Sequence, residues 1–254
     1  MNGTSLERKV AVVTGAAGDI GTAVTRKFLA EGARVVMVDI NEDKARAAMQ
    51  TLDVEADSCA VEICDISDRD KAHAAIDAAA MRFGAVDILV NGAAALTPGA
   101  TIAELDPEDW RQAIDVNLSG TIWMSQAAIK KMRPQGGGVI IHIASQLGQV
   151  GAPNRAAYGA TKAALIQLAR AMAVDHAAEG IRVVSLSPGA ILTSRLEKRY
   201  GGAQNVIDEL GHKYPIGRLG TPDDVAQSAA FIASDAAAFM TGADVLIDGG
   251  YTAS

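Results

Sequence analysis

Short apolar runs alternate along the chain with longer stretches whose apolar residues follow helical spacing. The runs are mostly continuous, which is typical of parallel strands that helices cover on both faces. We predict strands at residues 9–13, 34–39, 58–64, 86–90, 138–144, 181–187 and 243–247. We predict helices at residues 19–31, 42–52, 68–83, 107–133, 156–178 and 222–234, two of them beginning at the cap-and-proline pairs 106–107 and 221–222. The alternation predicts an α/β fold, a doubly wound, seven-stranded parallel sheet with helices on both faces, as a single domain over residues 1–254.

Composition supports one large domain and excludes several kinds of partner. The chain has 254 residues and 49% hydrophobic content, and no Pro-rich, Ser-rich or charged linker divides it. A net charge of −7 without a basic stripe argues against nucleic acid as a partner. Residues 1–9 lack the apolar core of a signal peptide, and no run of about twenty apolar residues would span a membrane. We therefore expect a soluble cytoplasmic protein.

The cysteines and histidines predict no metal site. Cys59 and Cys64 lie near and within the third predicted strand, where buried thiols are commoner than a disulfide or metal ligands. The four histidines form no cluster. We expect His142, in the fifth predicted strand, to be a hydrogen-bonded core residue.

A glycine-rich turn follows the first predicted strand and reads Thr14-Gly15-Ala16-Ala17-Gly18-Asp19-Ile20-Gly21. With the helix after it and the second strand, which ends at Asp39, it forms the βαβ unit of a dinucleotide site. Glycines let the backbone turn tightly and approach a pyrophosphate, and the amides at the helix start favour its negative charge. A carboxylate at Asp39 would bind both ribose hydroxyls and repel a 2′-phosphate. Because residues 14–21 contain no Arg or Lys to neutralise that phosphate, we expect NAD(H) rather than NADP(H).

Tyr158 and Lys162 lie four residues apart, on one face of a predicted helix. A free tyrosine has a pKa of ~10, and a nearby ammonium lowers that pKa because it favours the phenolate. A shift of about three units needs roughly 4 kcal/mol, which one close ammonium could largely supply. The pair therefore predicts proton transfer, although the same spacing occurs on solvated helix faces. Ser145, which closes the fifth strand and could hydrogen-bond a substrate oxygen, supports the catalytic interpretation.

The glycine-rich turn, Ser145, the Tyr158–Lys162 pair and Pro188-Gly189 together resemble the short-form short-chain dehydrogenase/reductase family, from Lys9 to Gly250. The resemblance implies a Rossmann-type fold and an enzyme that interconverts a secondary alcohol and a ketone by hydride transfer with NAD(H). It implies that Tyr158 is the general acid/base and that Lys162 also holds the nicotinamide ribose. Asn117, in the middle of a predicted helix, would support a water that links the lysine to solvent, unless a nearby carbonyl satisfies its amide.

Further cofactor contacts are implied by the same resemblance. The expected cofactor-binding set is Gly15, Asp19, Ile20, Gly21, Asp39, Ile40, Asp65, Ile66, Asn91, Tyr158, Lys162, Pro188, Gly189, Ile191 and Thr193. Asp65 would hydrogen-bond the adenine, but an aspartate there also fits a turn or a helix cap. The family's Asn-Asn-Ala-Gly turn reads Asn91-Gly92-Ala93-Ala94 here, so a structural role is safer for Asn91.

Asp19 departs from the family pattern, which has glycine at this position of the turn. A carboxylate about 5 Å from a phosphate would cost roughly 3 kcal/mol at an effective dielectric of about 20. We therefore expect its side chain to point away, into solvent, and to be tolerated rather than functional.

The substrate and the rival functions are less sharply defined by the sequence. The substrate set is Ser145, Gln146, Gln149, Asn154, Arg155 and Tyr158, and the resemblance makes residues 194–214 a substrate lid. These polar residues suggest a sugar, a cyclic alcohol or a hydroxy acid. Alternatives are a 3-oxoacyl thioester reductase, against which Asp39 argues, and a protein that binds NAD without turnover; an epimerase or dehydratase would need a further domain. Helices 107–133 and 156–178, with segment 217–222 and the last strand, resemble the interfaces of a homotetramer.

Overall fold

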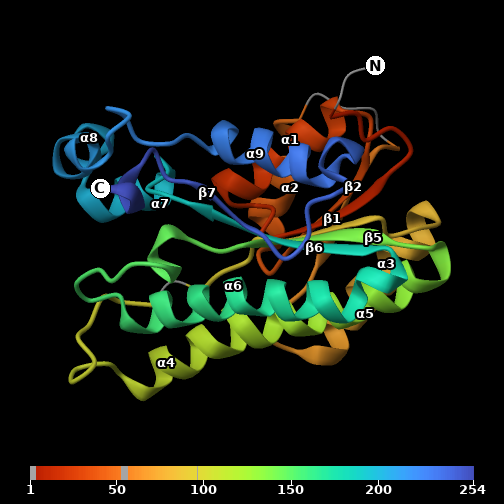
Figure 1. The fold of residues 1–254 in the computed structure, drawn as a ribbon, viewed down its shortest axis with the longest axis horizontal. Coiled ribbons are helices and arrows are strands. Elements are labelled where there is room, and N and C mark those ends of the chain that lie inside the picture. The colour runs from red at the N-terminus through yellow and green to blue at the C-terminus, as the bar shows by residue number, and fades with distance from the viewer. Residues whose placement is uncertain (1–3, 53–56, 96) are drawn as a thin grey trace.

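Parallel strands form one sheet through the centre of the molecule, and helices cover both of its faces (Figure 1). The computed structural model describes residues 4–52, 57–95 and 97–254, and within these residues the sheet has seven strands in the order β3-β2-β1-β4-β5-β6-β7. The strands are β1 (Val10–Thr14), β2 (Arg34–Asp39), β3 (Cys59–Ile63), β4 (Ile88–Asn91), β5 (Gly138–Ile143), β6 (Ile181–Pro188) and β7 (Asp244–Ile247). The predicted doubly wound α/β fold and all seven predicted strands are confirmed.

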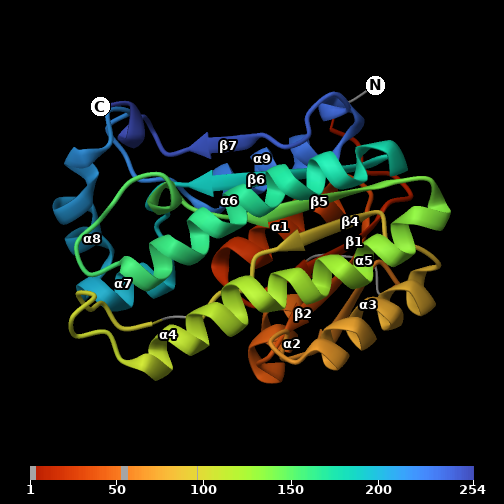
Figure 2. The ribbon, with the colours of Figure 1, turned by 60° about the horizontal axis from the view of Figure 1, so that its bottom comes forward.

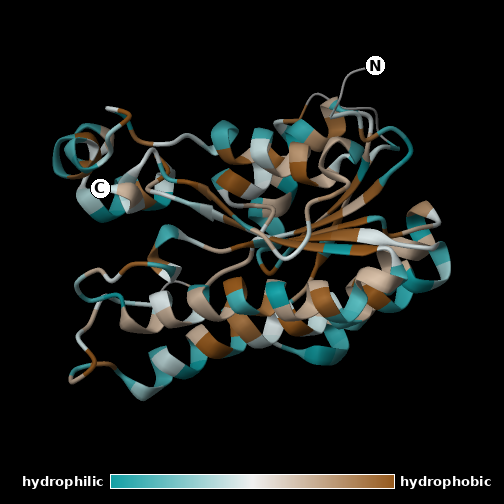
Figure 3. Cartoon of the chain, viewed as in Figure 1, coloured by the Kyte–Doolittle hydropathy of each residue, from teal (hydrophilic) through white to brown (hydrophobic). Residues whose placement is uncertain are grey.

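Two helical layers enclose the sheet, as the two views show (Figures 1 and 2). One layer contains α1 (Asp19–Ala30), α2 (Glu42–Gln50) and α9 (Pro222–Ala233). The other contains α3 (Arg69–Phe83), α5 (Thr121–Gln135) and α6 (Ala156–His176). A separate apolar cluster fills the space on each side of the sheet, and the strands are the most hydrophobic part of the ribbon (Figure 3). This burial explains why the strands read as continuous apolar runs.

The predicted helix at 107–133 is divided in the structure. It consists of α4 (Pro107–Ala113), a π-helical turn over Ile114–Gly120, and α5. The turn brings Gly120 so close to the loop after β3 that a Cβ on it would lie 2.7 Å from Ile66 Cγ1. The wider turn also carries Asn117, which is 1% exposed. Widened turns of this kind are common at functional sites.

The segment 194–214, predicted as a lid, is largely helical. It contains α7 (Ser194–Tyr200) and α8 (Ala203–Leu210), neither of which was predicted. The chain before the segment is joined to the chain after it, because Leu192 N donates to Gly220 O (2.8 Å) and Gly220 N donates to Ala190 O (3.0 Å). The segment therefore leaves the sheet and returns to it at nearly the same point.

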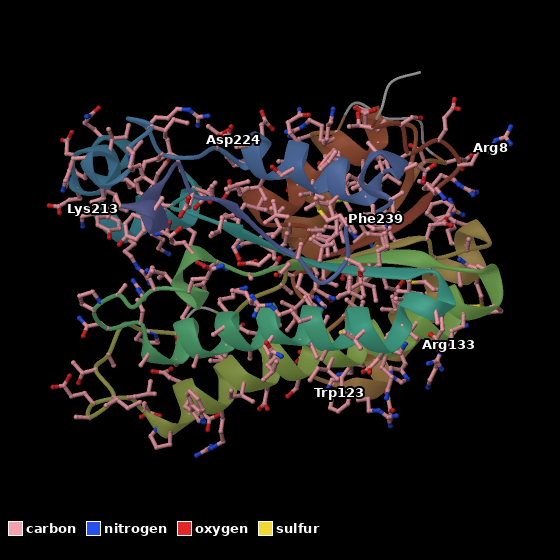
Figure 4. All side chains as sticks on the ribbon, viewed as in Figure 1. Arg8, Trp123, Arg133, Lys213, Asp224 and Phe239 are labelled. Carbon is pink, nitrogen blue, oxygen red and sulfur yellow. The ribbon has the colours of Figure 1, made fainter. Side chains whose placement is uncertain are left out.

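Helix α9 begins as the sequence predicts. Thr221 caps it, with Pro222 in the first turn, and the Asp224 carboxylate in turn accepts a hydrogen bond from Thr221 N (2.8 Å). Figure 4 shows Asp224 at this end of α9. Asp106 likewise caps α4 and accepts from Glu108 N (2.7 Å). Among the described residues, no helix is both long and apolar enough to cross a membrane.

Candidate active site

The turn between β1 and α1 is bare backbone packed tightly against the turn after β4. Gly15 has a φ of +67°, and a Cβ on it would lie 2.7 Å from Ala93 Cα. A Cβ on Gly21 would lie 2.3 Å from Gly15 O. Thr14 Oγ1 joins the two turns by accepting from Gly92 N (3.0 Å) and Ala93 N (3.2 Å). Only glycine fits at 15 and 21, and the resulting bare turn at a helix start suits a pyrophosphate.

Asp39 lies at the end of β2, directly beside this turn. Its Oδ2 accepts from Ala17 N (3.0 Å) and its Oδ1 from Asn41 N (3.0 Å). The next side chain, Ile40, is 66% exposed. A fixed carboxylate and an exposed apolar side chain at this place fit the ribose and adenine of a dinucleotide.

The side chain of Asp19 does not point into solvent as predicted. Its Oδ2 accepts from Ser194 N (3.2 Å) and Ser194 Oγ (2.8 Å). The carboxylate therefore joins the first turn of α1 to the first residue of α7. The aspartate that replaces the family's glycine thus connects the glycine-rich turn to the lid.

Two other predicted cofactor residues form local contacts. Asp65 Oδ1 accepts from Ser67 N (3.0 Å) and Ser67 Oγ (2.7 Å), which is the turn alternative considered above. Ile66 is buried. The cap of α3 is Asp68, not Asp65.

Asn91 and His142 form a buried pair behind the site. Asn91 Nδ2 lies 3.1 Å from Ser125 Oγ and 3.2 Å from His142 Nδ1. His142 Nε2 and Asn91 Oδ1 have no hydrogen-bond partner among the described residues, so the prediction of a satisfied histidine is only half right. Burial, followed by the charge of Lys162, lowers the pKa of His142 to about 3, and its ring is therefore neutral.

The segment after β6 carries the remaining predicted cofactor contacts. Pro188 ends the strand, and Gly189 N donates to Ile247 O (3.2 Å). A Cβ on Gly189 would lie 2.9 Å from Asp248 Cα, so this turn also tolerates only glycine. Ile191 is buried and forms an isolated bridge with Gly220. Thr193 caps α7 by accepting from Leu196 N (3.3 Å).

Ser145, Tyr158 and Lys162 come together where β5 ends and α6 begins. Ser145 Oγ accepts from Leu147 N (3.2 Å), which leaves its proton free for the hydrogen bond to the Tyr158 hydroxyl. Lys162 Nζ lies over the Tyr158 ring, 5.6 Å from its centroid, and donates to Ile143 O (2.7 Å). The structure thus unites a hydroxyl donor, a phenol and an ammonium that is 3% exposed.

The prediction that Lys162 makes Tyr158 a stronger acid is wrong for the free protein. Burial raises the pKa of Tyr158 above its ordinary value, against the opposing effects of the Ser145 hydrogen bond and the charges of Arg195, Arg155 and Arg199. Burial also lowers the pKa of Lys162 to about 8, helped by the charge of Arg195. Removal from water disfavours both charged forms, and at Tyr158 this outweighs the hydrogen bond and the arginine charges that favour the phenolate.

Asn117 is satisfied by protein groups rather than poised toward Lys162. Its Oδ1 accepts from Ala95 N (2.8 Å), and its Nδ2 donates to Thr161 Oγ1 (3.2 Å). Thr161 Oγ1 in turn donates to Tyr158 O (2.9 Å). Asn117 therefore supports the helical turn that carries Tyr158, and its proposed role in a water relay stays a prediction.

The predicted substrate residues divide into two groups. Gln146 is buried, with Nε2 3.1 Å from the Tyr214 hydroxyl, and Gln149 bonds Asp244. Asn154, which has a φ of +59°, and half-buried Arg155 line a cavity of about 530 Å³ beside the start of α6. The first group forms protein contacts, although Gln149 also lines the cavity that Asn154 and Arg155 face.

Two residues of the site were missed by the sequence interpretation. Arg195 and Arg199, on α7, contribute positive charge at the Tyr158 phenol. Their spacing of one helical turn was visible in the sequence, but the segment was not predicted to be helical, so no common face was assigned to them.

Known proteins resemble this chain over nearly its whole length. A family model described as enoyl-(acyl carrier protein) reductase matches residues 15–252. D-threitol dehydrogenase of Mycolicibacterium smegmatis is 41% identical over 249 residues, which cover 97% of this chain and 94% of that protein. Cis-4-hydroxycyclohexanecarboxylate dehydrogenase of Sinomonas cyclohexanicum is 39% identical over 251 residues, 99% of each protein. A solved short-chain dehydrogenase/reductase of Brucella melitensis, described as glucose/ribitol dehydrogenase, superposes with a TM-score of 0.91 at 32% identity, covering 99% of each chain.

The chain therefore belongs to the short-chain dehydrogenase/reductase family, whose members are oxidoreductases acting on CH–OH groups, generally with a nicotinamide cofactor.

The position of Asp39 generates a prediction about cofactor preference. Asp39→Asn keeps an oxygen that can accept from Ala17 N but removes the charge that would repel a 2′-phosphate. We expect the ratio of kcat/KM for NADP⁺ to that for NAD⁺ to rise on the order of 100-fold, because two charges about 5 Å apart repel by roughly 3 kcal/mol. Asp175→Asn, an exposed carboxylate near the end of α6, is the matched control. An unchanged ratio in Asp39→Asn would contradict the prediction that the Asp39 carboxylate repels the 2′-phosphate of NADP⁺.

Proposed function

We propose that the protein is an NAD(H)-dependent dehydrogenase that interconverts a secondary alcohol and a ketone. The observation that carries the proposal is the meeting of Ser145, Tyr158 and Lys162 at the end of β5, on the same edge of the sheet as the bare glycine turn. Such an edge, at the carboxyl ends of parallel strands, is where ligands bind in this class of sheet. A bound NAD⁺ would accept the hydride that leaves the carbinol carbon.

Each polar group has one task in this scheme. The Tyr158 oxygen takes the alcohol proton during oxidation and returns it during reduction. The Ser145 hydroxyl, whose lone pair already accepts from Leu147 N, donates a hydrogen bond to the substrate oxygen. The Lys162 ammonium, held by Ile143 O, keeps a positive charge over the phenol ring and retains two further N–H groups for the ribose of the cofactor.

The choice of NAD(H) follows from Asp39 and from the lack of a basic residue in the turn. NAD pools in cells are mostly oxidised, so we propose that the enzyme works in the direction of alcohol oxidation. The two cysteines are buried and free, which fits the reducing cytoplasm that we propose as its location. A substrate panel of threitol, cis-4-hydroxycyclohexanecarboxylate and a 3-oxoacyl thioester, with NAD(H) and NADP(H), separates the dehydrogenase from the thioester reductase and from a binding protein without turnover.

Tyr158→Phe tests the acid/base role directly. The variant keeps the ring and its packing but lacks the ionisable oxygen, so we expect kcat to fall by about 10²- to 10⁴-fold. The Kd for NADH, measured by fluorescence, should change by less than about threefold, since the phenol oxygen supplies little of the cofactor's total binding. Near-normal turnover in Tyr158→Phe would refute the proposed mechanism.

The raised pKa of Tyr158 predicts different pH dependences for the two directions. Oxidation needs the deprotonated phenol, and reduction needs the protonated one. Because the pKa of Tyr158 lies above its usual range, kcat/KM for oxidation should increase from pH 6 to pH 9, whereas kcat/KM for reduction should not. Lys162, with a pKa of about 8, loses its charge within this range, which would make the increase shallower than tenfold per pH unit. A flat oxidation profile over this range would show that the free enzyme already holds a phenolate.

We also propose that the protein is a homotetramer. Exposed apolar side chains stand on two elements expected to pair, namely Val174 (83% exposed) on α6 and Leu246 (37%) on β7. Two more lie on α9 and in the connection from α9 to β7, namely Phe231 (40%) and Phe239 (105%). Phe239, labelled in Figure 4, lies between α9 and β7. Assembly would remove this apolar surface from water.

Sedimentation equilibrium at micromolar concentration should give the mass of four chains. Phe239→Ser should lower the tetramer's stability toward dilution and produce smaller species, because it removes the most exposed aromatic side chain of the proposed contact. A wild-type monomer at micromolar concentration would contradict the assembly.

A further inference from the structure

The start of α7 is fixed to the glycine-rich turn by a single carboxylate. Asp19 Oδ2 accepts from both Ser194 N (3.2 Å) and Ser194 Oγ (2.8 Å), although the two residues lie 175 positions apart in the sequence. A glycine, which the family pattern has at position 19, could form neither of these hydrogen bonds. The chain therefore owes this contact to the residue that departs from the pattern.

Asp19 stands on backbone that is itself firmly held. Gly18 N donates to Gly15 O (3.1 Å), and Thr22 N donates to Gly18 O (2.8 Å), so hydrogen bonds close the backbone on both sides of Asp19. The close approach of Gly15 to the turn after β4 leaves this backbone little room to move. A side chain on such a turn is a fixed point, and hydrogen bonds to it can hold a more loosely attached segment in place.

The lid packs on itself, on its own base and on the end of the chain. Its apolar side chains form a small cluster that is separate from the two clusters beside the sheet. The cluster consists of Val206, Tyr214 and Leu219, with Ala190, Leu192, Leu196, Tyr200, Leu210 and Tyr251 packed around them. Among the described residues, it includes none from the glycine-rich turn. Apolar packing thus holds the lid together but does not hold α7 on that turn.

Polar contacts join the start of α7 to two neighbouring turns. Ser194 bonds Asp19, and the next residue, Arg195, donates from Nη2 to Ala94 O in the turn after β4 over a long 3.5 Å. Thr14 Oγ1 joins these two turns to each other. Figure 2 shows α7 and α8 at the end of the molecule toward which the arrows of β6 and β7 point. The shorter bonds to the Asp19 carboxylate are therefore the main polar link between α7 and the proposed cofactor site.

We propose that Asp19 is a positioning residue, which holds the start of the lid on the glycine-rich turn before the substrate binds. The proposal rests on the proposed function, since it assigns to that site a lid that is already docked in the free protein. A docked lid needs less ordering when an alcohol binds, and a protein whose competent state is only partly populated has a lower apparent affinity. Loss of the contact should therefore raise the KM for the alcohol. It should leave kcat nearly unchanged, because the reacting groups stand on β5 and α6.

A different role for Asp19 would be to act through its charge alone. A negative charge beside the turn weakens the binding of a pyrophosphate whether or not Ser194 is bonded to it. Such an effect would appear in the Kd for NADH, would vanish with any neutral residue at position 19, and would not depend on Ser194. A positioning role requires both partners, so it is lost from either side and is partly recovered by an uncharged acceptor.

The first experiment measures how fast trypsin cleaves the free protein after Lys198 and Arg199, two basic residues of α7 that do not adjoin Ser194. Cleavage of a folded protein reports the population of its open state when opening is fast. We expect Asp19→Ala and Ser194→Ala to speed this cleavage by about 3- to 30-fold, because hydrogen bonds to a charged group are strong but this pair is partly open to water. The increase should be larger in Asp19→Ala, which removes both bonds. Asp19→Asn keeps an oxygen that can accept and should give a smaller increase than Asp19→Ala.

The second experiment measures KM and kcat at saturating NAD⁺ for the alcohol of the substrate panel above that the wild-type enzyme oxidises fastest. Asp19→Ala and Ser194→Ala should each raise KM by about 2- to 10-fold and change kcat by less than about threefold. The double variant should exceed Asp19→Ala by less than about twofold in KM and in cleavage, because the loss of Asp19 already removes what Ser194 contributes.

Asp43→Ala is the matched control. Asp43 is an exposed aspartate in the first turn of α2, in the same helical layer as α1, so its removal alters a helix start in the same way. It should change neither the cleavage in α7 nor the KM. Thermal denaturation and the rate of tryptic cleavage outside the lid would show that each variant is folded.

Different outcomes overturn different statements. Unchanged cleavage in α7, or an unchanged KM, in both Asp19→Ala and Ser194→Ala would refute the positioning role and leave the dehydrogenase intact. A lower Kd for NADH in every neutral Asp19 variant, without any effect of Ser194→Ala, would also refute it and would assign Asp19 a role through its charge. Turnover of no alcohol by a wild-type protein that binds NADH would instead refute the proposed function. In that case the cleavage of the free protein would still decide whether Asp19 holds the lid.

Discussion

One buried hydrogen bond, from Lys162 Nζ to Ile143 O (2.7 Å), fixes the geometry on which the site depends. It joins α6 to the last residue of β5, two residues before Ser145. An ammonium that is 3% exposed is costly to bury unless it is hydrogen-bonded, so this contact compensates for its own burial. It also sets the rotation of α6, and this rotation brings Tyr158, one turn earlier, within hydrogen-bond reach of Ser145.

Burial and charge oppose each other at the phenol. Withdrawal from water favours the neutral tyrosine, whereas the Ser145 hydrogen bond and three arginines favour the phenolate. In the free protein burial prevails, and the same burial brings the pKa of Lys162 down to about 8. Both groups are thus held nearer to neutrality than they would be in water, and a modest change of charge in the site has a large effect on which one carries the proton.

The sequence was sufficient to predict the sheet and the grouping of Ser145, Tyr158 and Lys162. Continuous apolar runs predicted all seven strands, and the Tyr158–Lys162 spacing predicted a shared helical face. The lid helices were missed because α7 and α8 are short and are separated by Gly201-Gly202, so each offers too few residues for an apolar period to be recognised. The orientation of Asp19 was missed because its partner, Ser194, lies 175 residues away. The pKa of Tyr158 was wrong in direction because spacing shows which charges are near but not how much water is excluded.

The joined ends of the lid have an evolutionary consequence. Ala190 and Leu192 are hydrogen-bonded to Gly220, so residues 193–219 form a loop that is closed at its base. Residues in such a loop can be exchanged, inserted or deleted at small entropic cost and with little strain on β6 or α9. New specificities could therefore arise by drift in the loop, while the catalytic edge of the sheet stayed under purifying selection. Such modular divergence would allow dehydrogenases of one ancestry to act on chemically unlike alcohols.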